Sequence, residues 1–336
     1  MRKKLLIFCM IIAVLLGGTG TYILRQNSFH MVEQPIEIQT PQGKLTGTFV
    51  LPKNYTAPLG LVLFIHGDGP RDASADGGYK PLWERLASIG YASLSLNKRG
   101  IQGSEGNWLH QSMDDRVEEA RHALAWARQQ PMINGKRIGV WGASQAGWVI
   151  PKLAGKEPLA FSILVSPAMD WVRQGQYNTR KEMERAGHTE AEIQAKEADD
   201  RRVLKLLERR ASYEDYLAIA DANNAMTEDR WTFVGKNFRS DATGDLRHFH
   251  SPVLLLLGEE DIHVDAKETE RVYRQNVAPE LLSVAVFPAA DHSMLSPKTA
   301  NSELRAVLIS LFAPRQITIP GYMDEIERFL KNLPAR

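Results

Sequence analysis

The sequence predicts an α/β fold built on a mostly parallel sheet that helices cover on both faces. Short apolar runs without polar interruption are typical of strands buried on both sides. Stretches with helical spacing separate these runs, and such alternation favours a parallel sheet. With 336 residues, 43% of them hydrophobic, the chain can bury a large core. The runs are residues 61–65, 92–96, 138–141, 161–165 and 253–257.

The remaining elements follow the chain in order. Residues 36–39 and 45–51, joined by a turn at 41–43, predict an antiparallel hairpin at one edge of the sheet. Residues 282–288 predict a further strand. Helices are expected at 81–89, 113–129 and 323–333.

The N-terminus carries a segment that does not belong to this fold. Arg2, Lys3 and Lys4 precede residues 5–24, which contain no charge and would form about 30 Å of helix, enough to cross a bilayer. A cleavable signal peptide is the alternative, with small residues at 17–21 near the cut. We favour a retained anchor, because the apolar stretch is long and no A-x-A site stands out.

Both alternatives predict that the rest of the chain is exported. The basic residues hold the N-terminus in the cytoplasm. The domain then faces outward from the cytoplasmic membrane, or is periplasmic or extracellular after cleavage. Residues 1–28 are therefore expected to be a signal peptide or membrane anchor, and residues 32–336 the folded domain. The single cysteine, Cys9, lies in the N-terminal segment, so a disulfide is not expected in the domain.

Ser144 has the sequence surroundings of a nucleophile. In RIGVWGASQAG, residues 137–147, an apolar run stops at Gly142 and Ser144 follows two residues later. A serine at such a strand-to-helix turn is strained, and its Oγ is exposed above the sheet. The usual pattern is G-x-S-x-G, and Ala146 replaces its last glycine.

An oxyanion hole is expected beside this serine. The apolar run at 59–66 ends in HGDGP, where glycines let the backbone approach a reacting carbonyl. We expect the N–H of Gly67 or Asp68 to be one donor and the N–H of Gln145 the other.

Two further strands end in the groups that a serine needs. Residues 253–257 lead into an acidic cluster that includes Asp261, and residues 282–288 lead to His292. A serine hydroxyl requires an imidazole to take its proton and a carboxylate to orient that imidazole. The expected order is Ser144, Asp261, His292.

Other residues could take these roles. Glu259 and Glu260 are alternative acids, and Asp170 is a weaker one. His263 is the rival base, although it is too close to Asp261 in sequence to reach Ser144 easily. His66 either packs within its loop or contacts substrate.

The order of the three residues, each after a predicted strand, is that of the α/β-hydrolase fold. From about residue 32 to the C-terminus, the chain resembles this superfamily, and within it the bacterial dienelactone hydrolases and prolyl-oligopeptidase-type serine hydrolases. In that group the acid stands three residues after the glycine, which implies Asp261. The matching motifs are HGDGPRD at 66–72, NKRGIQGSEG at 97–106, GASQAG at 142–147, GEED at 258–261 and ADHS at 290–293.

A charged insertion separates the strand at 161–165 from the one at 253–257. Residues 172–245 show helical spacing, and an insertion here would form a helical cap above Ser144. Trp171, Tyr177 and Trp231 are candidates for an apolar substrate pocket, although each could equally belong to the core of the cap.

Composition and spacing exclude several function classes. The histidines and carboxylates show no metal-ligand spacing, so neither a metal nor a cofactor is expected. The net charge is +1, and −2 without the first 24 residues, which gives no support to nucleic-acid binding. We therefore expect a serine hydrolase that cleaves carboxylic esters of small molecules.

Two alternatives remain. An aminopeptidase or acyl-peptide hydrolase of the same fold would act on short peptides. A binding protein without catalysis would result if the methyl group of Ala146 misdirects Ser144.

Overall fold

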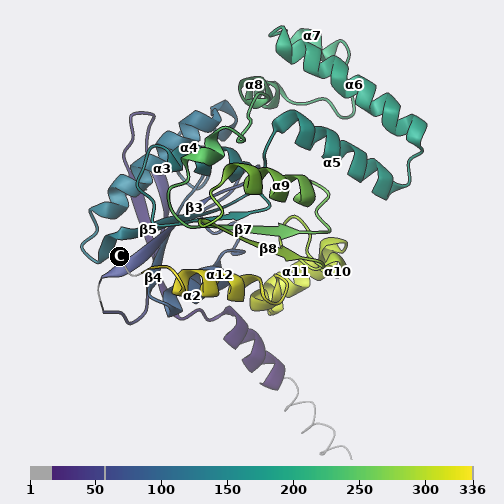
Figure 1. Cartoon of the computed structure of the whole chain (residues 1–336). Coiled ribbons are helices and arrows are strands. Elements are labelled where there is room, and N and C mark those ends of the chain that lie inside the picture. Colours follow the sequence, from purple (N-terminus) through teal and green to yellow (C-terminus); the bar gives the residue numbers. More distant parts are fainter. Residues whose placement is uncertain (1–16, 57, 335–336) are drawn as a thin grey trace, which may run out of the picture.

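The computed structural model describes residues 17–56 and 58–334 and contains one eight-stranded sheet within them. The strand order is β1-β2-β4-β3-β5-β6-β7-β8 (Figure 1). The strands are β1 Met31–Ile38, β2 Leu45–Pro52, β3 Leu59–Ile65, β4 Tyr91–Leu96, β5 Ile133–Ala143, β6 Ser162–Val165, β7 Val253–Gly258 and β8 Leu282–Phe287.

Strand directions confirm the predicted α/β-hydrolase fold. β1 pairs with β2, and β2 with β4, in antiparallel register. Every other neighbouring pair, from β4 to β8, is parallel. The carboxyl ends of β5, β6, β7 and β8 therefore meet at one edge of the sheet, where the loops after them can form a site.

Helices cover both faces of the sheet (Figure 1). α3, α4 and α9 lie on one face, and α2 and α12 lie on the other. Their bounds are α2 Lys80–Ser88, α3 Met113–Arg128, α4 Ile150–Ala154, α9 Ala266–Asn276 and α12 Tyr322–Lys331. Two further helices, α10 Pro297–Ala300 and α11 Glu303–Phe312, precede α12 on the second face. A capping box of Ser112 and Asp115 begins α3.

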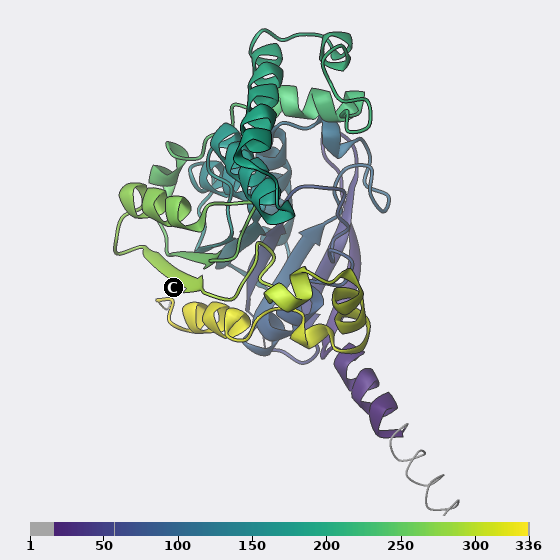
Figure 2. The same cartoon turned by 90° about the vertical axis from the view of Figure 1, so that its right-hand side faces the viewer.

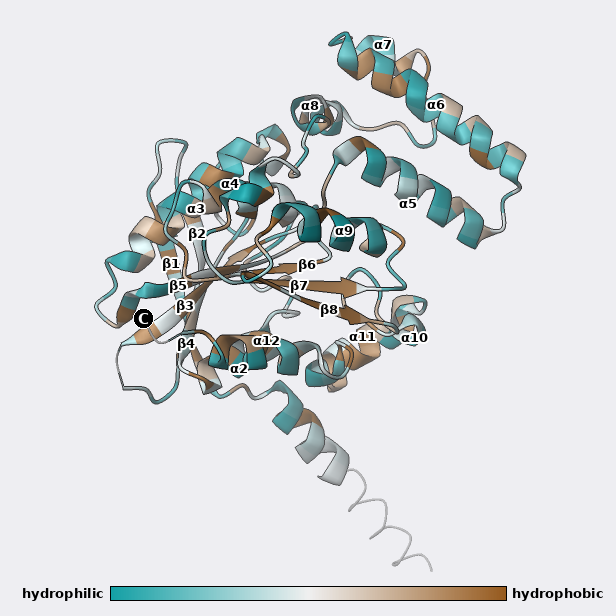
Figure 3. Cartoon of the chain, in the orientation of Figure 1, coloured by the Kyte–Doolittle hydropathy of each residue, from teal (hydrophilic) through white to brown (hydrophobic). Residues whose placement is uncertain are grey.

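The apolar core has two halves, one on each side of the sheet. On β3, Leu61 and Leu63 belong to the half that packs under α3, while Val62 and Phe64 belong to the half under α2 and α12. Alternation of side chains along a strand produces this division. Figure 3 shows the hydrophobic colouring concentrated along these central strands.

Four helices lie between β6 and β7, in the range where the sequence predicts an insertion. They are α5 Trp171–Ala186, α6 Glu190–Glu208, α7 Tyr213–Leu217 and α8 Glu228–Asn237. They project from one end of the molecule (Figure 2). A small apolar cluster of their own includes Leu207, Tyr216, Trp231 and Phe238.

The N-terminal segment is described only in part. Residues 17–27 form a helix, which we call helix 17–27. Residues 1–16, which include most of the predicted apolar segment, lie outside the described residues. Across the ranges that the structure describes, none of the helices is sufficiently long and apolar to span a bilayer.

Candidate active site

Ser144 occupies a strained turn at the carboxyl end of β5. Its φ angle is 56°, in the left-handed region that residues other than glycine rarely adopt. A short 3₁₀ helix, Ser144–Trp148, begins at the serine. The backbone of Gly67 passes close by, since a Cβ atom placed on this glycine would lie 3.2 Å from Ser144 Cβ and 3.8 Å from Oγ. Strain of this kind concentrates at functional sites.

Ala146 fits the turn without crowding the serine. A Cβ atom on Gly142 would lie 2.5 Å from the methyl carbon of Ala146, so the methyl group is directed at the space that Gly142 leaves open. Ala146 is fully buried there. The next residue must be small, because a Cβ on Gly147 would lie 2.4 Å from the carbonyl oxygen of Ala168. The methyl group of Ala146, which departs from the G-x-S-x-G pattern, therefore packs below the turn.

His292 and Asp261 form a hydrogen-bonded pair at the same edge of the sheet. His292 Nδ1 lies 2.8 Å from Asp261 Oδ2. The other carboxylate oxygen accepts the backbone N–H groups of His263 and Val264, at 2.7 and 2.9 Å. Asp261 is buried, so these bonds fix both of its oxygens. Donation from Nδ1 leaves Nε2 of His292 without a proton and able to act as a base.

Ser144 Oγ and His292 are not hydrogen-bonded to each other in the described structure. Serine and base are often farther apart without substrate and approach in the substrate complex. Ser144 ends β5, Asp261 follows β7, and His292 follows β8, and parallel pairing brings these ends to one edge.

The rival acids and base occupy other environments. His263 Nδ1 lies 2.6 Å from Asn178 Oδ1, and the rings of His263 and His292 are 5.1 Å apart in an edge-to-face arrangement. Burial, together with the neighbouring His292, lowers the pKa of His263. Glu259 and Glu260 are exposed. Asp170 caps the N-terminus of α5 by accepting the N–H of Arg173.

Two buried cations hold the loop that is expected to form half of the oxyanion hole. The ammonium of Lys98 donates to the carbonyl oxygen of Gly67 at 2.6 Å, and the guanidinium of Arg116 donates to that of His66. In a trans peptide the N–H points opposite to the C=O. The N–H groups of Gly67 and Asp68 are therefore turned away from the cations.

Arg116 also reaches the other half of the expected hole. Its guanidinium donates to Gln145 Oε1 at 3.1 Å, so one side chain of α3 holds both segments. Lys98 and Arg116 are both buried, and the ammonium of Lys98 lies 4.8 Å from the centre of the Trp108 ring. Burial, together with the charge of Arg116, keeps the pKa of Lys98 well below its usual value.

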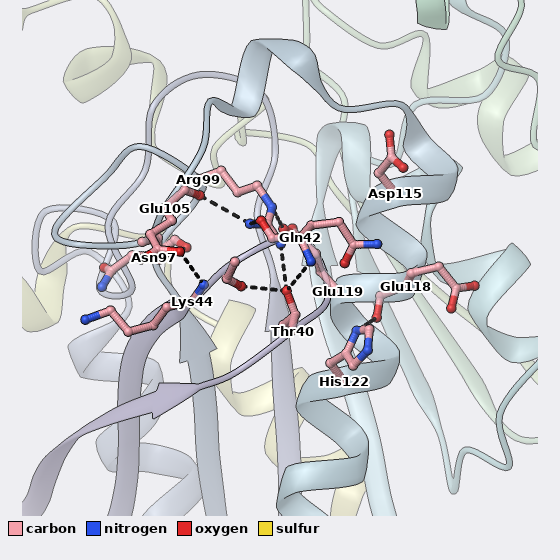
Figure 4. A network of polar contacts seen from close by, with 12 residues as sticks. Thr40, Gln42, Lys44, Asn97, Arg99, Glu105, Asp115, Glu118, Glu119 and His122 are labelled. Carbon is pink, nitrogen blue, oxygen red and sulfur yellow. Dashed lines mark hydrogen bonds and ion pairs between the residues drawn. The ribbon is translucent and has the colours of Figure 1, made fainter.

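Lys98 lies in the NKRG motif, whose neighbours brace the same region. Asn97 Oδ1 accepts the N–H of Ala73 at 2.6 Å, on the loop after β3. Arg99 is buried and donates to the carbonyl oxygen of Gln42 at 2.7 Å and to Thr40 Oγ1 at 3.2 Å. Figure 4 shows Arg99 directed at the turn of the β1–β2 hairpin. These two residues shape the loop and do not face Ser144.

His66 has structural hydrogen bonds. Its Nε2 lies 2.7 Å from the carbonyl oxygen of Leu96, and its Nδ1 lies 3.2 Å from the hydroxyl of Tyr79. Burial, with the positive charge of Lys98, lowers the pKa of His66 to about 3. The ring is therefore neutral near pH 7 and packs within the loop.

The helical insertion contacts the loops of the site at two points. On α8, Arg230 forms two bonds with the carboxylate of Asp68, at 2.8 and 3.1 Å. Burial opposes ionisation of Asp68, but the bonds from Arg230 outweigh it and lower the pKa of that carboxyl. On α5, the Tyr177 hydroxyl donates to the carbonyl oxygen of Asp261 at 2.9 Å. The loop that contains Gly67 and Asp68, which we call the oxyanion loop, and the loop that contains Asp261 therefore both contact the insertion.

The three predicted pocket residues have different surroundings. Trp171 stacks on Trp148 with 4.8 Å between ring centres and borders a cavity of about 320 Å³ between α5 and α6. Trp231 is buried and stacks on Tyr216 inside the insertion, 4.6 Å between centres. Tyr177 is the one whose polar atom reaches a loop of the site.

A groove of about 560 Å³ lies beside His292 and is largely acidic. Glu182, Glu260 and Asp291 line it, with Arg185 as a basic neighbour. Burial raises the pKa of Asp291. In the described ranges, no three His, Cys, Asp or Glu side chains are arranged to bind a metal ion.

Sequence reasoning missed the two buried cations and Arg230. A signal existed for Arg116, which lies on the buried face of α3 between Met113 and Val117. An arginine on an apolar helix face indicates a buried partner. Lys98 lies two residues after the end of β4, a strand that is almost wholly buried. Nothing in the sequence distinguishes Arg230 from the other charges of the insertion.

By sequence, this chain is similar to peptidases. The family model for X-Pro dipeptidyl-peptidases (S15 family) matches residues 43–294. Dipeptidyl aminopeptidase BIII of Pseudoxanthomonas mexicana is 33% identical over 133 residues, 34% of this chain and 18% of that protein. Dipeptidyl-peptidase 5 of Porphyromonas gingivalis is 21% identical over 273 residues, 78% of this chain and 34% of that protein. The matches thus span 18% and 34% of those longer proteins.

Solved structures with the same fold include esterases. An esterase of Pyrococcus furiosus superposes with a TM-score of 0.59 at 17% identity, covering 93% of this chain and 94% of the other. The structure of Est1E from Butyrivibrio proteoclasticus with bound ferulic acid gives 0.54 at 16% identity, covering 88% and 96%. Identities this low show a shared fold and leave the substrate open.

Proposed function

The chain belongs to the X-Pro dipeptidyl-peptidase (S15) family, and we propose that it hydrolyses an acyl bond through a covalent intermediate on Ser144. The observation that carries this proposal is the His292–Asp261 pair, 2.8 Å apart, at the sheet edge where Ser144 sits in its strained turn. Nucleophile, base and orienting acid are the groups that acyl transfer needs.

In the proposed mechanism, Ser144 Oγ attacks the carbonyl carbon while Nε2 of His292 takes its proton. His292 then gives this proton to the leaving group, and Asp261 holds the ring in the required tautomer. The N–H groups of Gln145 and of Gly67 or Asp68 stabilise the oxyanion. Water, activated by His292, releases the acyl group.

Carboxylic esters are the proposed substrates. In an aminopeptidase or dipeptidyl peptidase, the substrate's ammonium belongs to the acyl half, whose carbonyl oxygen faces the oxyanion loop. Here Lys98 and Arg116 hold that loop, and the nearby carboxylate of Asp68 is paired with Arg230. The guanidinium of Arg116 and the pairing of Asp68 with Arg230 favour a neutral or anionic acyl group.

Peptides are the second candidate. Family membership and the two dipeptidyl-peptidase relatives support it. So does the groove beside His292, where Glu182 and Glu260 would attract a basic side chain on the leaving half of a peptide. The leaving side of the scissile bond lies next to the base, so this groove would receive that half of the substrate.

We also propose that the domain is exported and held at the membrane by residues 5–24. The uncharged stretch after three basic residues supports this location. Protease treatment of intact spheroplasts would test it, because an outward-facing domain should be digested while a cytoplasmic protein is protected.

Labelling with a fluorophosphonate tests the proposed nucleophile. We expect one adduct, located on Ser144 by mass spectrometry and missing from Ser144→Ala. A folded protein that forms no adduct would contradict the proposal and support a binding role.

Turnover of matched substrates then distinguishes the two bond types. We expect p-nitrophenyl acyl esters to be cleaved with a higher kcat/KM than aminoacyl and Gly-Pro p-nitroanilides. The reverse order, abolished equally by Ser144→Ala, would assign the enzyme to peptides.

A further inference from the structure

α11 exposes a row of large apolar side chains. Leu304, Leu308 and Leu311 are spaced as i, i+4 and i+7, on one side of the helix, and Val307 and Phe312 flank them. Leu304 is 70% exposed and Leu311 is 57% exposed. No residue of α11 is buried. We call these five side chains the apolar face of α11.

This exposure is concentrated at one place. Eleven large hydrophobic residues are exposed in the described structure, and five of them form the apolar face of α11. Two more, Tyr22 and Leu24, lie on helix 17–27. Single exposed apolar residues are ordinary on a protein surface, whereas a contiguous group marks a contact with another apolar phase.

Helix 17–27 and α11 are neighbours. Asn27 Nδ2 donates to the carbonyl oxygen of Leu311 at 3.0 Å. Directly after α11, Arg315 donates to the carbonyl oxygens of Arg25 and Ser28, at 2.6 and 2.9 Å. Figure 2 shows helix 17–27 leaving the body at the end opposite to the helical insertion, next to the segment that contains α11.

We propose that the apolar face of α11 docks on the surface of a lipid bilayer, beside the point where the N-terminal segment enters it. This inference rests on the proposed membrane location of residues 5–24. That uncharged segment runs into helix 17–27, so the bilayer it would enter begins next to α11. Burial of the apolar face in the acyl boundary removes it from water.

The charges around the face fit the same partner. Arg25 ends the uncharged segment, and Arg305 lies exposed on α11 among the leucines. Arginines at the edge of an apolar surface extend to lipid phosphates while their stems remain in the apolar layer. A second copy of the chain could cover the same face, but it would not account for the continuity with residues 5–24.

Docking would also orient the active site. Ala300 and Asn301, directly before α11, border the groove beside His292. With the apolar face in lipid, this rim of the groove lies close to the headgroups.

Site-directed spin labelling of the full chain tests the proposal. In a Cys9→Ser background, single labels at Leu304→Cys, Leu308→Cys or Leu311→Cys are placed in vesicles of phosphatidylethanolamine and phosphatidylglycerol. Collision with oxygen reports lipid, and collision with a nickel chelate reports water. We expect the oxygen-to-nickel ratio to be at least severalfold higher than at Leu217→Cys and Ile219→Cys, two equally apolar exposed positions of the insertion.

Two results would overturn the proposal. Ratios on α11 equal to those of the controls would place the face in water. Low collision with both reagents would mean that protein covers it, and dipolar coupling between labels would then identify a second copy.

A double variant provides a control for this test, and the spin-label readout does not depend on catalytic activity. Leu308→Glu with Leu311→Glu, both at exposed positions, should fold and should lower the oxygen-to-nickel ratio at Leu304→Cys towards the control value. The labels report depth whether or not the protein is catalytic, so failure of the proposed hydrolysis would not affect them.

Discussion

The parallel sheet and the helical insertion are held in place by different forces. All residues of β3 and β7 are buried, so the strands that lead to the site are fixed by apolar packing on both faces. The insertion packs on the body at Trp171 and Phe233, and otherwise joins it through polar contacts such as Arg230–Asp68, His110–Asp229 and Arg173–Glu268. Close-packed interiors tolerate little displacement, whereas exposed ion pairs break and reform at small cost.

This contrast separates two tasks. Strand ends hold Ser144, Asp261 and His292 in a fixed frame, while polar contacts link the insertion to the loops around them. Changes in the sheet should therefore cost stability, and changes at the contacts with the insertion should be small and sensitive to salt. Four predictions test this division, from the largest expected effect to the smallest.

Gly142→Ala should give the largest loss. The added methyl carbon would lie 2.5 Å from Ala146 Cβ, 2.8 Å from Ile150 Cδ1 and 3.0 Å from the carbonyl oxygen of Ile65. Overpacking of this kind lowers the free energy of unfolding by about 3 kcal/mol, which urea denaturation can measure.

Two further variants serve as controls for this prediction. Adding Ala146→Gly to Gly142→Ala should recover most of the loss, because it removes the nearest contact. Gly235→Ala on α8, where a Cβ would meet nothing within 4 Å, should be neutral or stabilising. Equal losses of unfolding free energy at Gly142 and Gly235 would contradict the predicted difference between the sheet and the insertion.

His66 should make the stability of the sheet depend on pH. Its pKa is about 3 in the folded protein because the ring is buried, and near 6.5 when unfolded. Below pH 6.5 the unfolded chain therefore binds a proton that the folded chain does not. Its stabilising contribution is complete above pH 6.5 and is lost as the pH falls towards 3.

Urea denaturation at pH 6.5 and 4.5 measures this effect. From this group, the wild type should lose roughly 2 to 3 kcal/mol between the two pH values. His66→Gln should be less stable at pH 6.5 but should vary less with pH. Parallel pH dependences of the two proteins would show that His66 titrates normally.

Lys98→Met should slow the reaction without weakening substrate binding. The variant removes the cation at the carbonyl of Gly67, so the N–H of Asp68 is held less firmly. Deleting a whole oxyanion donor costs about 100-fold or more in kcat, and loosening one should cost about tenfold.

Steady-state kinetics on the best ester would show the fall in kcat with little change in KM. Lys98→Arg, which keeps a cation near the carbonyl, should recover part of the rate. A rise in KM alone would assign Lys98 to substrate binding.

Breaking the Arg230–Asp68 pair should have the smallest effect. Both side chains are about one-third exposed, and such pairs contribute about 1 kcal/mol or less. In a double-mutant cycle with Arg230→Gln and Asp68→Asn, the coupling measured by urea denaturation should fall further in 1 M salt. A coupling above about 2 kcal/mol that persists in salt would mean that the insertion is fixed like the sheet.

Local pattern was sufficient to predict most of the strands. Residues 253–257 were expected and β7 is Val253–Gly258, because an apolar run bounded by turn residues has no other stable conformation in a buried layer. β5 is longer than expected, beginning at Ile133. Ile133 pairs with Leu59, and the polar residues NGKR, 134–137, form an irregularity before Ile138 pairs with Leu61. α11 was not expected as a separate helix.

The sequence by itself determined where most strands lie along the chain, the turn that carries Ser144 and the presence of an acid and an imidazole after later strands. Hydrophobic period and glycine placement act over a few residues, so they can be read locally. The tertiary structure decided that the ring of His292, and not the ring of His263, is bonded to the side chain of Asp261, and that Lys98 and Arg116 hold the loop beside Ser144. These contacts join residues far apart in the chain, and their geometry exists only once the sheet has brought its strand ends to one edge.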